Sequence, residues 1–393
     1  MQRCRQGVAA AALLGLAEPG IAQSSWFEGW EGEGRAEATV ALSPGRGDAG
    51  DRDSRDGTAE LALTYGLERV LENGAEIGVR LGGRFQLDHP ARPGFSGLIG
   101  PGGEVDDGLA LRGAFTGLTA AGLAEDDAVV AQLETVFAYI DGGYGELLAG
   151  RDIGVARRFH EGPETVFRRH TAVNARLDTS GIATVLTRSD LTGPSFKVSY
   201  ATPRLLGVRL GVSYTPSADT GGVDRDPALN EPGIAEPRLD QAVEVGVNAT
   251  RLLRASGVRV SAYGAYSRAN VDLLPNDLDF GTVEVWSAGT LIEREGVRFG
   301  ADFLSSDNGG GRYQAWSVGL ASEWQGFDWS GGFGRSVDDL TAFDGEAWHA
   351  GVSREITDWL DLAVGIDQQR LISPSGQAFR SLGPVIEITL RPN

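Results

Sequence analysis

The sequence predicts an all-β protein, specifically a 16-stranded antiparallel transmembrane β-barrel with an inward-folded third long loop. Three observations support this fold class. Polar and apolar residues alternate along many segments, short and long connections alternate between those segments, and aromatic residues gather beside the short connections. Each of these features is typical of a barrel that crosses a membrane with strands.

The alternation has a period of two residues. In AEIGVRLGGRFQL, one face carries Ile77, Val79, Leu81 and Phe85, and the other carries polar residues and glycine. Such a period places successive side chains on opposite faces of a strand. Sixteen segments show the pattern: 35–43, 58–69, 73–88, 128–140, 143–151, 194–202, 206–215, 241–251, 256–269, 280–292, 295–304, 312–324, 326–336, 345–355, 358–370 and 378–391.

The connections between these segments alternate in length. Every second connection is a hairpin-length turn, such as Asp141-Gly142-Gly143 or Gln325-Gly326. The other connections are longer and span 44–57, 89–127, 152–193, 216–240, 270–279, 305–311, 337–344 and 371–377. A membrane barrel sorts its connections in this way, with short turns at the periplasm and long loops outside.

Aromatic residues flank several short turns, and they predict a girdle at the membrane interface. They are Tyr139, Tyr144, Trp324, Phe327, Trp329 and Trp359. The alternative is a water-soluble β-protein whose apolar face points inward. Sixteen strands in one barrel would enclose a space too wide for side chains to fill. A polar interior with an apolar exterior therefore fits better, and that arrangement requires lipid.

Net charge and the N-terminal segment limit the possible partners and the cellular compartment of the protein. The chain has 393 residues and a formal net charge of -19, which argues against a nucleic-acid partner. Residues 1–22 are predicted to be a secretory signal peptide, with Arg3 and Arg5 before an apolar stretch and a cleavage site at Gly20-Ile21-Ala22. Cleavage would remove Cys4 and leave 23–393 as one barrel domain, exported and without disulfides.

Two stretches resemble the outer-membrane porins of Gram-negative bacteria. YIDGGYGELLAGRD (139–152) is similar to the strand pair that precedes a porin's constriction loop, and GPSFKVSYATPRLLGVRLGVSYTP (193–216) to the hairpin that follows it. The resemblance covers the expected barrel domain. It implies an outer-membrane homotrimer in contact with lipid and lipopolysaccharide. It further implies water-filled channels for passive diffusion of small hydrophilic solutes and ions, without a cofactor or metal.

The resemblance also places the pore constriction in loop 152–193. Charges of both signs around a narrow aqueous passage create a transverse field that discriminates between solutes. The residues expected at the constriction are Arg80, Arg84, Asp152, Arg157, Arg158, Glu161, Glu164, Arg168 and Arg169. A short helical turn is expected to start at Pro163-Glu164. The simpler alternative is a solvated charged loop with no influence on selectivity.

The sequence also leaves other functions open. One is a solute-specific channel of the same architecture, and another is a barrel enzyme or adhesin. The chain has four histidines, no GxSxG motif and no recognisable catalytic triad pattern. His160 and His170 do not have the spacing of a helical metal pair. Segment 44–57 could bind a divalent cation or be a mobile loop. The resemblance to trimeric porins implies that loop 89–127 can latch onto a neighbouring subunit.

Overall fold

The computed structural model describes residues 29–44, 56–89, 110–119, 129–219, 234–274, 278–374 and 376–392. The expected signal peptide at 1–22 lies outside the described residues, and so does most of segment 44–57.

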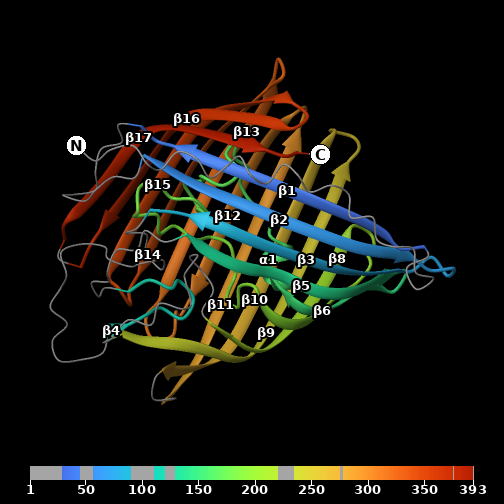
Figure 1. The fold of residues 1–393 in the computed structure, drawn as a ribbon. Coiled ribbons are helices and arrows are strands. Elements are labelled where there is room, and N and C mark those ends of the chain that lie inside the picture. Colours follow the sequence, from blue (N-terminus) through green and yellow to red (C-terminus); the bar gives the residue numbers. More distant parts are fainter. Residues whose placement is uncertain are drawn as a thin grey trace.

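Sixteen consecutive antiparallel strands form a closed barrel, because the last strand pairs with the first (Figure 1). The prediction of a 16-stranded antiparallel barrel is therefore confirmed. A seventeenth, two-residue strand, β4 (Ala110–Leu111), pairs in parallel with β9 and is not part of the wall. The wall strands are β1 (Glu31–Leu42), β2 (Gly57–Val70), β3 (Glu76–Leu87), β5 (Val130–Gly142), β6 (Gly145–Asp152), β7 (Ser195–Ala201), β8 (Val208–Asp219), β9 (Ile234–Leu253), β10 (Val258–Leu274), β11 (Leu278–Arg294), β12 (Val297–Ser306), β13 (Tyr313–Trp324), β14 (Phe327–Asp338), β15 (Phe343–Thr357), β16 (Leu360–Ile372) and β17 (Ala378–Leu390).

The short turns use the backbone geometry that two-residue hairpins require. In the β11–β12 turn, Glu295 and Gly296 have φ of 51° and 81°; in the β13–β14 turn, Gln325 and Gly326 have φ of 54° and 74°. Positive φ at both central residues is characteristic of a type I′ turn, whose twist matches that of the flanking strands. Glycine at the second position accepts this conformation without strain.

The two faces of the wall have opposite character. On β13, Trp316 and Leu320 point outward and are 42% and 52% exposed, whereas Ser317 points inward and is 2% exposed. On β17, the outward Leu382 and Leu390 alternate with the buried Glu387 and its neighbours, as the sequence pattern predicted. An apolar exterior of this extent is stable only against lipid.

Several strands are longer than the sequence pattern indicated, and β9, β10 and β11 are the longest. β9, β10 and β11 span 20, 17 and 17 residues and occupy most of the predicted connection 270–279 and part of 216–240. Asn, Asp and Pro residues favoured loops there, but cross-strand pairing continues. Arg238 on β9 contacts Asp240 at 3.3 Å and Asp272 on β10 at 3.2 Å. Opposite charges on facing positions stabilise such a ladder.

Two local expectations were wrong. Tyr139 does not belong to the outer girdle, because it faces the interior and donates its hydroxyl to Glu76 at 2.7 Å. The other flanking aromatics are exposed on the outside, with Tyr144 at 93%, Trp324 at 62% and Trp359 at 49%. The helical turn is α1 (Val155–Arg158), which precedes Pro163 instead of starting there. Among the described residues, no helix has the length and apolarity to span a membrane.

Candidate functional site: the inward loop and its charged wall

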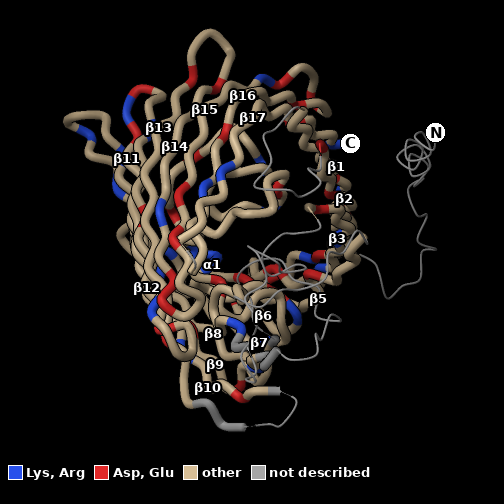
Figure 2. The backbone as a smooth tube through the Cα atoms, turned by 90° about the vertical axis from the view of Figure 1, so that its left-hand side faces the viewer, with Lys and Arg blue, Asp and Glu red and all other residues tan. Residues whose placement is uncertain are grey.

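Residues 153–194 connect β6 to β7 and will be called the inward loop, because they contact the interior face of strands all round the barrel. The loop begins with α1 beside β8 and β9. The backbone N–H groups of Val155 and Ala156 donate to Ser213 on β8 and Glu244 on β9, at 3.0 Å and 3.3 Å. In Figure 2, α1 lies within the barrel and basic and acidic positions follow the chain inside the wall.

Interior glycines allow the loop to approach the wall closely. A Cβ on Gly211 would lie 2.8 Å from the Phe159 ring, and a Cβ on Gly300 would lie 2.5 Å from the Pro163 backbone. A Cβ on Gly351 would lie 2.7 Å from the Phe167 ring. Glycines within a strand weaken the sheet locally. Because they have no side chain, another segment of the chain can lie directly against the sheet at these positions. We call the set the glycine belt: Gly211, Gly246, Gly289, Gly300, Gly319, Gly334, Gly345, Gly351 and Gly365.

A carboxylate on the last strand fixes the middle of the loop. Glu387 accepts hydrogen bonds from the backbone N–H groups of Arg168, Arg169 and His170 at 2.6 Å, 3.0 Å and 2.8 Å. Glu387 is only 2% exposed, so these three donors compensate its buried charge. This contact fixes the loop backbone, and it leaves the side chains of Arg168 and Arg169 available for other carboxylates.

Arginines of the loop reach carboxylates on the β1–β5 side of the wall. Arg169 contacts Glu37 on β1 at 2.5 Å and Glu60 on β2 at 2.9 Å. Arg176 contacts Glu60 at 2.6 Å and Glu134 on β5 at 3.0 Å. Glu60, at 3% exposure, is therefore shared by two loop arginines and is the centre of a buried ion-pair network.

Of the two expected wall arginines, only Arg84 belongs to this network. It is 3% exposed, donates to Gln132 at 2.6 Å and lies 3.4 Å from Glu134. Arg80 lies on the same face of β3 but is exposed, with its guanidinium 6.0 Å from the centre of the Tyr139 ring. The structure thus places Arg84 under the loop and Arg80 beside the open interior.

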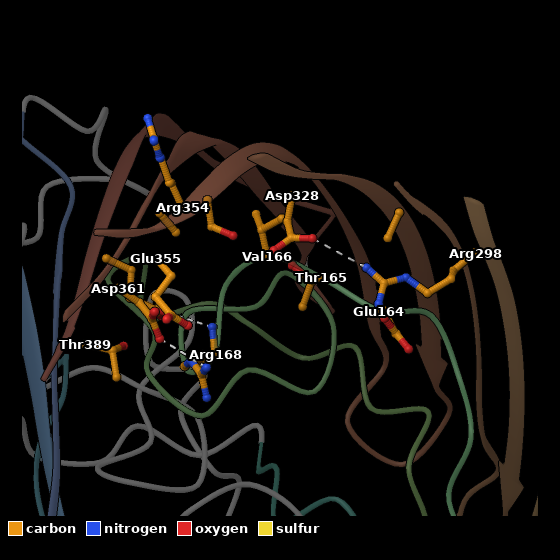
Figure 3. A pocket seen from close by; sticks show the side chains of 14 residues that line it. Glu164, Thr165, Val166, Arg168, Arg298, Asp328, Arg354, Glu355, Asp361 and Thr389 are labelled. Atoms are coloured by element: carbon orange, nitrogen blue, oxygen red, sulfur yellow. Dashed lines mark hydrogen bonds and ion pairs between the residues drawn. The ribbon is translucent and has the colours of Figure 1, made fainter. Parts of the chain in front are cut away.

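The loop also contacts the β12–β17 side, where a cavity of about 380 Å³ separates it from the wall (Figure 3). Glu164 pairs with Arg298 on β12 at 2.9 Å, and Arg168 pairs with Asp361 on β16 at 3.1 Å. Both pairs line the cavity, together with Asp328. Charges of both signs therefore face one water-accessible space.

The remaining expected residues lie near α1. Arg157 forms an ion pair with Asp190 inside the loop, and Arg158 reaches Glu146 on β6 at 2.5 Å. Glu161 accepts a hydrogen bond from Asn248 on β9 at 3.0 Å. Asp152, at the end of β6, is 8% exposed. All nine expected residues face the interior side of the wall or lie on the loop, but they form several clusters and not one ring.

The loop histidines lie in its packing, where His160 is half-buried and His170 is buried. His160 Nδ1 lies 3.0 Å from the Tyr263 hydroxyl, and its Nε2 lies 3.4 Å from Asp302. Burial, with the positive charges of Arg188 and Arg157, lowers the pKa of His160 to about 3. His170 and His349 pack at the edge of the Phe167 ring, with ring centres 6.4 Å and 6.1 Å away. No cluster suited to a metal ion occurs in the described part of the chain.

Sequence reasoning missed the wall carboxylates that hold the loop. They are Glu37, Glu60, Glu134, Glu244 and Glu387, each on the interior face of a strand. Their signal is an acidic residue on the polar face of an alternating segment. That signal shows which way the side chain points, but it does not show which loop residue it meets.

Comparison with known proteins identifies the family. The sequence profile of the Gram-negative porins matches residues 9–371, so the chain belongs to that family. The protein is an outer-membrane channel for the passive diffusion of solutes. No curated protein sequence matches it.

Solved structures share the fold at low sequence identity. The outer-membrane channel DcaP of Acinetobacter baumannii is 12% identical, with a TM-score of 0.59 over 93% of this chain and 98% of DcaP. OprB of Pseudomonas putida is 11% identical, with a TM-score of 0.57 over 93% of this chain and 94% of OprB. OmpF of Salmonella typhi is 12% identical, with a TM-score of 0.55 over 92% and 97% of the two chains.

Proposed function

We propose that the inward loop is the pore constriction and that it filters small hydrophilic solutes by size and charge. The observation that carries this proposal is that three arginines and one glutamate of the loop meet partners of opposite sign on β1, β2, β5, β12 and β16. Charges of both signs across an aqueous gap orient dipolar solutes. Apolar solutes form no interactions with these charges that would offset the free-energy cost of displacing water from them.

A weak preference for cations belongs to this proposal. The cavity of Figure 3 is lined by five acidic residues, Glu164, Asp328, Glu355, Asp361 and Glu387, and by three arginines, Arg168, Arg298 and Arg354. The local excess of negative charge raises the concentration of cations in the cavity.

The experiment is planar-bilayer recording of the purified protein. We expect stepwise ion conductance. A folded protein that never conducts would refute the proposed pore constriction. Replacing Glu161 and Glu164 with lysine should shift the reversal potential in a salt gradient toward anions, because both lie on the loop. Glu72→Lys, in the exposed β2–β3 turn, makes the charge change of one of these two substitutions away from the loop, and it should shift the reversal potential by less than half as much.

We also propose that the assembled form is a homotrimer surrounded by outer-membrane lipid and lipopolysaccharide, and that residues 1–22 are cleaved on export. A Vibrio cholerae OmpT structure with a TM-score of 0.53 is described as a trimer form. Native mass spectrometry of the detergent-extracted protein would give the subunit number. N-terminal sequencing would locate the cleavage site.

A solute-specific channel is the second candidate, and the defined cavity beside Arg168 and Arg298 favours it. A bound solute would make the flux saturate with concentration, whereas simple diffusion stays linear. We propose no enzymatic step, because the loop histidines are engaged in packing. Hydrolysis of a peptide or phospholipid substrate that is lost in His160→Gln or His170→Gln would refute this.

A further inference from the structure

A second segment of the chain folds into the barrel. Residues Arg112–Thr119 belong to the long connection between β3 and β5, and they are buried throughout. Phe115, Thr116 and Leu118 have no exposed surface. The segment closes on itself, because Gly113 N–H donates to the Leu118 carbonyl at 2.8 Å and Gly117 N–H donates to the Gly113 carbonyl at 2.9 Å.

One residue between two wall strands fixes this segment. Asn308, in the β12–β13 connection, accepts hydrogen bonds from the N–H groups of Phe115 and Thr116 at 2.9 Å and 3.1 Å. Its own amide group donates to the Thr116 hydroxyl at 3.1 Å and to Asp338 at 3.3 Å. The backbone carbonyl of Asn308 accepts a further hydrogen bond from Ala114 N–H at 3.0 Å. The segment is thus held at three successive peptide groups.

Tyr313 joins the segment to the inward loop. Its ring lies 5.8 Å from the Phe115 ring, centre to centre. Its hydroxyl accepts from Leu186 N–H at 2.7 Å and lies 3.0 Å from the Thr184 carbonyl. One residue at the long-loop end of β13 therefore contacts both segments that enter the barrel.

Together the two segments complete an apolar core inside the barrel. Phe115 and Leu118 pack with Ile182, Leu186 and Leu191 of the inward loop. The wall adds inward apolar side chains near the long-loop ends of its strands, namely Ala218, Leu239, Ala242, Ala269, Val271, Val283, Val285, Leu304, Tyr313, Ala315, Phe343, Leu371 and Phe379. Such side chains would face water in an open channel, so burying them against the two segments stabilises this arrangement.

The core lies on one side of the barrel. Its wall residues come from β8–β13 and β15–β17, and none of them comes from β1, β2, β3, β5, β6 or β7. On the other side, interior residues at the long-loop ends of β1, β2 and β3, such as Ser43, Thr58 and Asp88, are also buried, so both sides of the interior are narrowed at this level.

We propose that Arg112–Thr119 is a second, fixed size-limiting element on the long-loop side of the channel, and that Asn308 is its positioning residue. The inference deepens the proposed filter. The inward loop selects by charge near mid-barrel, whereas this segment sets the largest hydrophilic solute that can enter from outside. The expected solute class is neutral sugars and other polar molecules near the size limit, since the core offers them no charge.

The test compares two variants in the full-length protein. One replaces Ala114–Leu118 by a glycine-serine stretch of equal length, and the other is Asn308→Ala. Each should raise the single-channel conductance by roughly 1.5-fold or more and admit larger sugars in liposome swelling, because each opens cross-section next to the passage. Unchanged conductance and size limit in folded variants would overturn the proposal.

Wild-type protein provides a measurement that does not depend on variant folding. Polyethylene glycols of increasing size are added to one side of the bilayer, and the conductance change reports which sizes enter. The cut-off should be smaller from the long-loop side than from the short-turn side. Equal cut-offs from both sides would overturn the proposal.

The proposed charge filter can fail separately. If Glu161→Lys with Glu164→Lys shifts the reversal potential while the Asn308 and segment variants change nothing, only the size-limiting element is refuted. If the lysine variants leave the reversal potential unchanged while the cut-offs of the wild type differ between the two sides, only the charge filter is refuted.

Discussion

The carboxylate of Glu387 accepts the backbone N–H of Arg168 at 2.6 Å, which joins the last strand of the barrel to the middle of the inward loop. The same carboxylate accepts the next two N–H groups of the loop. A carboxylate that receives several amide hydrogen bonds in a buried place contributes more than a neutral acceptor, because charge-assisted bonds are stronger.

Glu387→Ala should therefore loosen the loop. Three N–H groups of the loop would lose their acceptor, and the expected cost is on the order of 3 kcal/mol. The variant should show noisier single-channel currents and a lower unfolding midpoint in detergent. Glu355→Ala removes a carboxylate from the same cavity, but Glu355 is 60% exposed, and this control should unfold like the wild type. Equal midpoints for the two variants would contradict the anchoring role.

The ion pairs around Glu60 predict opposite shifts in ion selectivity. Arg169→Gln with Arg176→Gln removes two positive charges and should move the reversal potential toward cations. Glu60→Gln removes the shared negative charge and should move it toward anions. Each change in permeability ratio should be roughly twofold, since charges beside a narrow passage act on ions at close range. The measurement is the reversal potential in a salt gradient.

Arg35→Gln is the matched control for these charge changes. Arg35 also pairs with a glutamate, Glu33, but the two side chains are 75% and 69% exposed. Screening by salt makes such a pair weak. Selectivity shifts of the same sign for Glu60→Gln and the double arginine variant would contradict the role of this network.

The glycine belt predicts that one methyl group in the wall can displace the loop. In Gly300→Ala the new Cβ would lie 2.5 Å from the Pro163 backbone, so either the loop or the strand must shift. Overpacking of this kind costs about 1–3 kcal/mol. We expect a lower unfolding temperature and an altered conductance.

Gly66→Ala on β2 is the control for that substitution. A Cβ at Gly66 would meet no atom within 4 Å, and its backbone does not have a positive φ. This variant should match the wild type in both measurements. Identical behaviour of Gly300→Ala and Gly66→Ala would show that the loop does not press on the wall at Pro163.

Strand positions and faces could be predicted from the sequence because a period of two residues is a local property. Each alternating segment specifies its own inward and outward residues, as Trp316 and Ser317 on β13 illustrate. Strand ends are not specified locally in this way. The β9–β11 extensions rest on cross-strand pairs such as Arg238 with Asp272, which no single strand reveals.

The candidate site was predictable only in part. The charged loop could be found from its position after the fifth wall strand. Its partners could not, because the contact of Arg169 with Glu60 joins residues far apart in the chain. The burial of Phe115 was also missed, since a glycine-rich connection gave no sign that it would fold inward. Glycine on the polar face of a strand, as at Gly300 and Gly319, was the available signal for a close-lying loop.

His160 predicts how the protein responds to acid. Its pKa is lowered from 6.5 to about 3 by burial, with Arg188 and Arg157 adding to the effect, even though Asp302 lies nearby. The folded protein therefore keeps His160 neutral while the unfolded chain protonates it below about pH 6.5. The contribution of His160 to the free energy of unfolding is therefore fully present above pH 6.5. It is lost as the pH falls from 6.5 toward 3.

The measurement is urea unfolding in detergent at pH 7.5 and pH 4.5. His160→Gln cannot titrate, so the wild type should lose about 2 kcal/mol more than this variant between the two pH values. Because His160 is neutral across this range, wild-type and variant channels should show the same change in conductance with pH. An equal loss of stability in the two proteins would show that His160 is not held neutral by its burial in the loop.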